Sequence, residues 1–366
     1  MRLYLAGGLV VVVAAGAIFV TTLTREPATV APPSSAPPSP TPESAATVLA
    51  RADDLLLDGQ WDAAVLTYDE ASRLEPDSAV APTRASTALV FAHRYQDAID
   101  YAQYALTLAP RSSAAHAALA LAFNWNGDTE RAQAEARRAV ELDSTNARAH
   151  AYVAEAAADQ FRLADAEAAL KRAEALAPED PEVLRVGGYL LEQKQDYAAA
   201  AEAYQRAVEQ RPRWAHLYVQ LGHALRVLQR YDEAIDTFAA AAELAPTDPR
   251  AEAGLGRTYF DQEDYAAAID HFQRATEIDP SYPTGWGQLA NIYYQRRDYA
   301  RAQPLYEKAV ELERSPALNA SYRNALGWIY LGNHQTAQAR EQFSRALEES
   351  PGLRGARDGL ARLNGH

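Results

Sequence analysis

The feature that most constrains this chain is a repetition at a fixed spacing. Three stretches are nearly identical: "DYAAAAEAYQRAVEQRP", "DYAAAIDHFQRATEIDP" and "DYARAQPLYEKAVELER", which begin at residues 196, 264 and 298. Their starts lie 68 and 34 residues apart, so the repetition has a period of 34 residues. Periods of this length are typical of stacked-repeat proteins, in which each unit contacts mainly its neighbours.

Alignment on this period divides most of the chain into nine units. Eight units follow one another without a gap, and a three-residue insertion, 317–319, precedes the ninth. The units are 45–78, 79–112, 113–146, 147–180, 181–214, 215–248, 249–282, 283–316 and 320–353. A further helical stretch near residues 355–363 would cap the last unit, which has no neighbour to cover it.

Small residues and prolines recur at fixed places in the units. Alanine stands at place 20 and again at place 27 of every unit, where two helices are expected to pack closely. Leucine and glycine pairs occupy places 7 and 8 of several units, such as Leu221 and Gly222. Proline at place 32 of most units, such as Pro212, ends the second helix because it clashes with a continuing helical turn.

These places together resemble the tetratricopeptide repeat family over residues 45–353. The resemblance implies an all-α fold, a right-handed superhelical solenoid of about nine helix-turn-helix repeats with a C-terminal capping helix. It also implies that the first helices line a concave groove that binds a peptide or protein segment, with no cofactor. We divide the chain into an N-terminal segment (1–26), a Pro-rich linker (27–43), the repeat array (44–353) and a capping helix with tail (354–366).

The N-terminal segment is strongly apolar. Residues 3–23 carry no charge, and as a helix they would span about 31 Å, the thickness of the hydrocarbon layer of a membrane. We predict a transmembrane signal anchor. A cleaved signal peptide is the alternative, because Ala15, Gly16 and Ala17 offer a small-residue cleavage site. Both interpretations export the repeat array.

The charges beside this segment predict its orientation. Arg2 precedes the apolar run, whereas Arg25 is offset by Glu26, so the N-terminus is expected in the cytoplasm and the array outside it. Insertion in the opposite sense would instead give a cytoplasm-facing adaptor. The prolines of residues 27–43 predict an extended spacer between the membrane and the array.

Composition and motifs argue against several kinds of chemistry. A net charge of −14 disfavours nucleic acid, and the absence of cysteine excludes disulfides and thiolate sites. His216 and His223 lie seven residues apart, about 10.5 Å along a helix, which is too far for one metal ion. His116 and His150 share place 4, where we expect packing between units. No catalytic motif is recognisable, so we predict no enzyme activity and no metal site.

The concave groove is the predicted binding site, and its expected residues fall into two sets. In the family, ligand-facing side chains come from places 2, 5, 9, 12 and 13 of each first helix. The apolar set, from units one to three, is Leu49, Leu56, Leu57, Val90, Phe91, Leu121 and Trp125. The basic and aromatic set, from units five to eight, is Arg185, Tyr189, His216, His223, Arg226, Arg250, Arg257, Phe260, Asn291 and Tyr294.

Arginine pairs with carboxylates through two parallel hydrogen bonds, and tyrosine adds contact area at low entropic cost. We therefore expect an acidic or carboxylate-bearing protein segment as the partner, and a membrane-anchored, extracytoplasmic scaffold that assists assembly of an envelope complex. An anionic envelope polymer is the alternative ligand.

Overall fold

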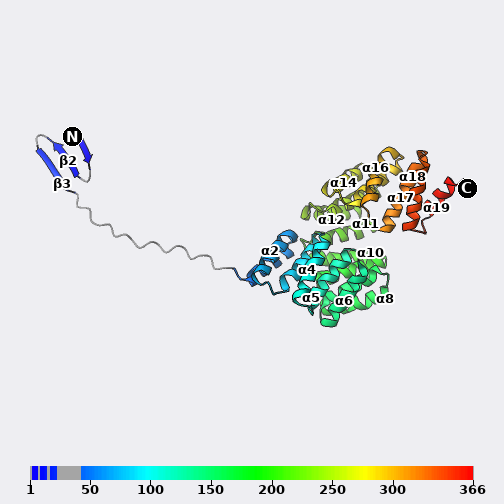
Figure 1. Cartoon of the computed structure of the whole chain (residues 1–366), viewed down its shortest axis with the longest axis horizontal. Helices are drawn as coiled ribbons and strands as arrows, with labels where there is room; N and C mark the ends of the chain where they lie inside the picture. The colour runs from blue at the N-terminus through cyan, green and yellow to red at the C-terminus, as the bar shows by residue number, and fades with distance from the viewer. Residues whose placement is uncertain (1, 7–8, 15–16, 23–42, 366) are drawn as a thin grey trace. The chain divides into compact units, whose positions relative to one another are not determined.

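The computed structural model describes residues 2–6, 9–14, 17–22 and 43–365 (Figure 1). The chain divides into two compact units, Met1–Glu43 and Ser44–His366. The Pro-rich linker predicted over residues 27–43 lies almost entirely outside the described residues.

The described part of the first unit contains three antiparallel strands instead of the expected helix over residues 3–23. The strands are β1 (Arg2–Ala6), β2 (Leu9–Ala14) and β3 (Ala17–Thr22), in the order β1-β2-β3. The helical expectation was wrong because these runs are rich in β-branched residues, and in sequence they are separated by residue pairs that contain glycine, a hairpin signal. Among the described residues, no helix combines the length and the apolar character that crossing a membrane requires.

The second unit is all-α, as the repeat predicted. Within residues 44–365 the structure has nine consecutive helix pairs and a final helix, α19 (Arg354–Leu363). The pairs are α1 (Ala45–Leu57) and α2 (Trp61–Leu74), α3 (Val80–Phe91) and α4 (Tyr95–Leu108), α5 (Ser113–Trp125) and α6 (Thr129–Leu142), α7 (Ala147–Asp159) and α8 (Leu163–Leu176), α9 (Pro181–Gln193) and α10 (Tyr197–Gln210), α11 (Ala215–Val227) and α12 (Tyr231–Leu244), α13 (Pro249–Asp261) and α14 (Tyr265–Ile278), α15 (Pro283–Gln295) and α16 (Tyr299–Leu312), and α17 (Pro316–Gly332) and α18 (Thr336–Glu349). The three-residue insertion is absorbed into α17, which is 17 residues long.

In several units the first helix is capped by the last residue of the preceding unit. The side chains of Ser112, Asn146, Asp180 and Asp248 accept hydrogen bonds from backbone N–H groups in the first turns of α5, α7, α9 and α13. These bonds satisfy donors that have no partner inside a helix. The repeat period therefore sets where each first helix begins.

One residue between the two helices of every pair has a left-handed backbone conformation. Its φ lies between 57° and 84° in all nine units, at Gly59, His93, Gly127, Phe161, Gln195, Gln229, Glu263, Arg297 and His334. A left-handed residue lets the chain reverse after a helix, at a cost for residues other than glycine. Seven units have a residue other than glycine at this position and bear the conformational cost, whereas Gly59 and Gly127 avoid it in the other two units.

The core is built from the small residues that recur in the repeat. Every alanine at places 20 and 27 is at most 1% exposed, which confirms the close helix packing expected there. Glycine at place 8 lies against an aromatic ring of the same unit. A Cβ atom added at Gly222 would lie 2.8 Å from Phe238, and one at Gly256 would lie 2.9 Å from Phe272. Larger residues at these glycines would push the two helices apart.

Place 4 has a structural role beyond packing. His150, Tyr218 and Trp286 each donate a hydrogen bond to the backbone carbonyl six residues earlier, at 3.0, 2.9 and 3.0 Å. His116 has the same contact, with Nε2 3.2 Å from the carbonyl of Pro110. These carbonyls belong to the turn that ends the preceding unit, so in these four units place 4 ties the unit to the one before it.

Candidate functional site

Arg185, one of the four arginines expected to face the groove, is buried. Only 1% of it is exposed. Both terminal nitrogens donate to the carboxylate of Glu155 at 2.7 Å, and Nε donates to Glu182 at 3.1 Å. The guanidinium also lies over the ring of Trp125, 5.3 Å from its centroid. Arg185 is therefore already paired inside the protein and offers no free face to a ligand, contrary to our expectation.

The carboxylates around Arg185 respond differently to burial. Burial raises the pKa of Glu155 despite the neighbouring Arg185 charge. Burial would also raise the pKa of Glu182, but the positive charge of Arg185 and contact with His216 lower it to about 2. Glu182 therefore stays ionised, and one arginine joins units four and five through two carboxylates.

The array contacts itself across a long sequence separation, a feature that the repeat did not predict. Trp214 donates its indole N–H to the carbonyl of Leu56 at 3.2 Å, and Arg213 donates to the carbonyl of Asp58 at 3.3 Å. Gly59 approaches so closely that an added Cβ would lie 2.4 Å from the carbonyl oxygen of Arg213. We call this meeting of the α1–α2 turn with the start of α11 the closure contact (Figure 1).

Aromatic rings from both sides fill the closure contact. The ring of Phe91 lies 5.0 Å from Trp214 and stacks on His216 at 4.7 Å with an interplanar angle of 8°. Trp61 lies 5.6 Å from Trp214, and Trp125 lies 6.0 Å from His216. Trp214 and His216 are 2% and 4% exposed. Such ring pairs stabilise beyond the area they bury, each by about 0.5 to 1.5 kcal/mol.

A polar contact continues the closure toward unit seven. Arg250 donates to Asp248 at 2.7 Å and approaches Nε2 of His93, from unit two, at 2.6 Å. Burial would raise the pKa of Asp248, but hydrogen bonds from His93 and Arg250 hold it well below its usual range. Arg250 thus serves the same internal contact as His216.

The apolar set of expected groove residues lies largely in the core. Val90, Phe91 and Leu121 are buried, and Trp125 is partly buried beneath Arg185 and His216. Leu49 and Leu56 pack partly buried against the same core, and Leu57 is exposed. The structure thus joins parts of the two predicted surfaces to each other instead of leaving both open.

Sequence reasoning missed Trp214, although the repeat contains a signal for it. Trp214 stands immediately before α11, where Ser112, Asn146, Asp180 and Asp248 supply a capping oxygen in other units. The side chain of Trp214 makes no such capping bond. The first helix of unit six therefore follows a large apolar ring, where several other units have a capping side chain. Such a loss of a stabilising cap indicates that the residue is used for another contact.

The remaining basic residues form a more open surface on α11, α13 and α15. Arg226 and Arg257 both pair with Asp261, and Arg257 lies 5.4 Å from the ring centroid of Phe260. Arg257 also donates to Gln288 at 3.4 Å, and Asn291 donates to the same amide oxygen. The side chain of Arg257 is 41% exposed. We call this connected group, from Arg226 to Asn291, the polar surface.

Other predicted groove residues lie along these helices in separate contacts. Tyr294 packs beside Tyr306, which donates to Asn291 at 2.5 Å. His223 lies against Phe238 at 5.1 Å between ring centroids. Tyr189 donates its hydroxyl to Asp159. Within the described part of the chain, no group of three or more histidine or acidic residues is placed to hold a metal ion.

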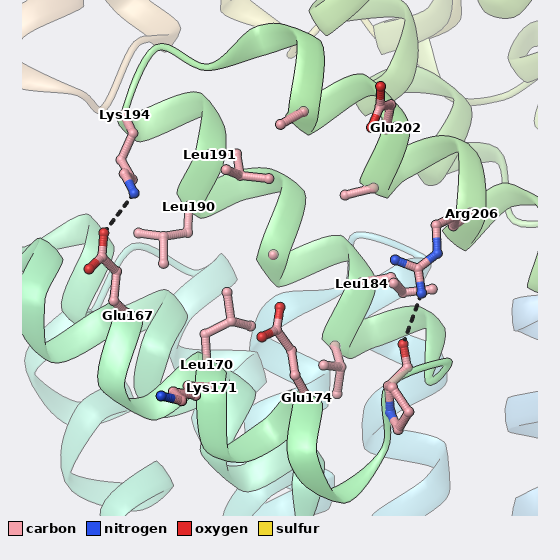
Figure 2. Close-up of a pocket in the computed structure, with 15 residues that line it drawn as sticks. Glu167, Leu170, Lys171, Glu174, Leu184, Leu190, Leu191, Lys194, Glu202 and Arg206 are labelled. Atoms are coloured by element: carbon pink, nitrogen blue, oxygen red, sulfur yellow. Dashed lines mark hydrogen bonds and ion pairs between the residues drawn. The ribbon is translucent and has the colours of Figure 1, made fainter.

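A separate hollow of about 440 Å³ lies between α8, α9 and α10 (Figure 2). Its walls are apolar and include Leu170, Leu184, Leu190 and Leu191. Charged side chains stand around its rim: Glu167, Lys171, Glu174, Lys194, Glu202 and Arg206. No residue of this hollow was among the predicted groove residues.

Three sequence profiles, all described as tetratricopeptide repeat, match the chain. They cover residues 125–181 and 154–213, residues 215–281, and residues 259–329. Together they match more than half of the chain, which therefore belongs to the tetratricopeptide repeat family. No curated protein matches it.

Solved structures share the fold at low sequence identity. A chain of the APC/C hetero-tetramer Cut9-Hcn1 is 18% identical with a TM-score of 0.63, over 81% of this chain and 58% of that one. This chain thus spans less than two thirds of that relative. Human IFIT1, solved as a dimer with m7Gppp-AAAA, is 17% identical with a TM-score of 0.60, over 88% of this chain and 81% of that one.

Proposed function

We propose that this protein is a scaffold that binds an acidic segment of a partner protein on the polar surface. The observation that carries the proposal is the arrangement of Arg226 and Arg257, which share the single carboxylate of Asp261. Two arginines and one aspartate leave one positive charge unbalanced in a protein of net charge −14. Arg257 is also the most exposed of the three and stands beside an aromatic ring, so a ligand carboxylate can reach it.

The test compares two double variants of the full chain. Arg226→Gln with Arg257→Gln removes the cations of the polar surface, whereas Arg274→Gln with Lys308→Gln removes two exposed cations of second helices. Binding is measured by fluorescence anisotropy with labelled random peptides that contain two to four glutamates, and with the same peptides in which lysine replaces glutamate.

We expect glutamate peptides to bind about tenfold more weakly to the first variant than to the second, with unchanged helicity in both. The difference should shrink in high salt because exposed charges are screened. If the two variants bind the glutamate peptides equally weakly, the attraction depends on net charge alone and not on the polar surface. Equal binding of the lysine peptides would overturn the preference for an acidic segment, and competition by a polyanion but not by peptides would favour an envelope polymer.

The N-terminal segment supports a second element of the proposal, attachment to a membrane with the array outside the cytoplasm, where it would assist assembly of an envelope complex. Its support is the sequence: 21 residues without charge, preceded by Arg2 and followed by a Pro-rich stretch. A reporter fused after the C-terminus should be active only outside the cytoplasm, and the protein should stay with membranes after a high-salt wash. Reporter activity inside the cell would contradict export, and a cytoplasm-facing adaptor would then be the better description.

A further inference from the structure

Gly187 lines the hollow between α8, α9 and α10, at a place where other units carry a large side chain. Gly187 occupies place 7 of unit five, in the middle of α9. The same place is filled by a large apolar residue in every other unit from the third onward: Leu119, Val153, Leu221, Leu255, Leu289 and Leu326. All of these leucines are 5% exposed or less.

Nothing in the local packing requires glycine at this position. A Cβ added at Gly187 would meet only Leu170 at 3.8 Å and Glu174 at 3.9 Å, which are ordinary contacts. The neighbouring Gly188 is different, because a Cβ there would lie 2.5 Å from the ring of Tyr204. Glycine within a helix costs about 0.5 to 1 kcal/mol relative to alanine. Gly187 therefore weakens α9 and leaves a space with apolar walls.

The charges on the rim of the hollow are unevenly satisfied. Lys194 pairs with Glu167 at 2.7 Å, and Arg206 pairs with Glu179 at 2.7 Å. Glu174 and Glu202 have no hydrogen-bond or ion-pair partner among the described residues, and neither does Lys171. Figure 2 shows the Glu174 carboxylate over the hollow, between Leu170 and Leu184. The unpaired rim groups are thus two carboxylates and one ammonium.

We propose that this hollow is a second binding site, which receives a leucine-sized apolar side chain of a partner protein with a lysine or arginine beside it. The apolar side chain enters the space beside Gly187 and Leu170, and the neighbouring cation reaches the carboxylates of Glu174 and Glu202. The site is walled by α8, α9 and α10 and shares no residue with the polar surface. Its partner is basic where the polar surface favours an acidic one.

The test uses random dodecapeptides displayed on phage, selected on the full chain and counter-selected on the variant Gly187→Leu. Gly187→Leu fills the hollow with the residue that other units carry, and Gly187→Ala leaves most of it empty. Glu174→Gln with Glu202→Gln keeps the hollow and removes its unpaired carboxylates. Selected peptides are then measured against each variant, and helicity is compared by circular dichroism.

We expect the selected peptides to share an apolar residue beside lysine or arginine. They should bind the Gly187→Ala variant as well as the unmodified chain, and the Gly187→Leu variant at least about tenfold more weakly. The glutamine variant should also lose affinity, whether or not Gly187→Leu folds. Arg226→Gln with Arg257→Gln should leave these peptides bound, which separates this site from the proposed function. The proposal fails if no peptide distinguishes Gly187→Leu from the unmodified chain, or if the peptides that do so lack a basic residue.

Discussion

At the scale of single residues, His216 couples the closure contact to pH. Burial lowers the pKa of His216 to about 4, although the carboxylate of Glu182, 3.9 Å from Nε2, acts in the opposite direction. The His216 side chain takes up a proton near pH 6.5 in the unfolded chain, but only near pH 4 in the folded chain. Stability from the neutral ring is therefore complete above pH 6.5 and falls as the pH drops from 6.5 to 4, by about 2 to 3 kcal/mol.

The variant His216→Phe should lose the part of the pH dependence that His216 contributes, because phenylalanine can keep the stack on Phe91 without taking up a proton. His223, whose pKa burial also lowers to about 4, keeps its own contribution in both proteins. The measurement is the free energy of unfolding by urea at several pH values, followed by tryptophan fluorescence, since Trp61, Trp125 and Trp214 all lie at the closure contact. Parallel curves for the variant and the unmodified chain between pH 6.5 and 4 would show that His216 is not buried as described.

Glu192 has the opposite pH dependence. Burial raises its pKa to about 7, although a hydrogen bond from Tyr204, at 3.1 Å, lowers it. The folded chain then holds a proton that the unfolded chain releases above pH 4.5, so stability is lost as the pH rises through 7. Glu192→Gln should therefore stabilise the protein at pH 8 by about 1 to 2 kcal/mol and have little effect at pH 4. Thermal unfolding at the two pH values checks the sign, and destabilisation at pH 8 would contradict it.

At the scale of elements, the sequence was enough to place the helices of the array. The alanines at places 20 and 27 and the proline at place 32 depend on contacts within a unit or with its neighbour, which a period of 34 residues reveals directly. The strands β1, β2 and β3 were missed because hydrophobicity and length were taken as the signal, whereas the β-branched residues favour the extended conformation. Short apolar runs do not distinguish the two states by length alone.

The repeat unit also predicts which deletions the array tolerates. Deleting residues 282–315 removes α15 and α16 and brings Ser281 before Pro316, which restores a serine at the N-cap position of α17. We expect this variant to lose helicity in proportion to two helices and to unfold in one sharp transition. Deleting only residues 282–298 leaves α16 without its partner helix and should broaden the transition. Similar melting curves for the two deletions would mean that 34 residues are not the structural unit.

At the scale of the whole array, the closure contact explains why the candidate site was only partly predictable. Family places identified side chains near the concave face, including Phe91, Trp125, Arg185 and His216, but could not show that these residues meet one another. That meeting joins residues more than 100 positions apart, such as Leu56 and Trp214. It depends on how the rotations of successive units add up, which no single unit encodes. The polar surface lies beyond most of this contact and keeps an exposed arginine.

The closure contact can be tested at Gly59 with a matched control at Gly127. Both residues occupy the left-handed position between paired helices, with φ of 71° and 84°. A Cβ at Gly59 would lie 2.4 Å from the carbonyl oxygen of Arg213, whereas one at Gly127 would meet nothing within 4 Å. Asparagine tolerates the left-handed conformation, so backbone strain is small and similar at the two positions. Only Gly59→Asn should therefore open the contact.

The most direct measurement is the distance across this contact by electron spin resonance. The chain has no cysteine, so Asp62→Cys with Gln210→Cys places two spin labels on exposed positions on either side of the contact without further changes. We expect one narrow distribution of short distances in the doubly labelled chain and in its Gly127→Asn variant. The Gly59→Asn variant should show a broader distribution at longer distances. A broad distribution of long distances in the chain with both glycines intact would contradict the account, because the concave residues would then be open to ligands rather than buried against one another.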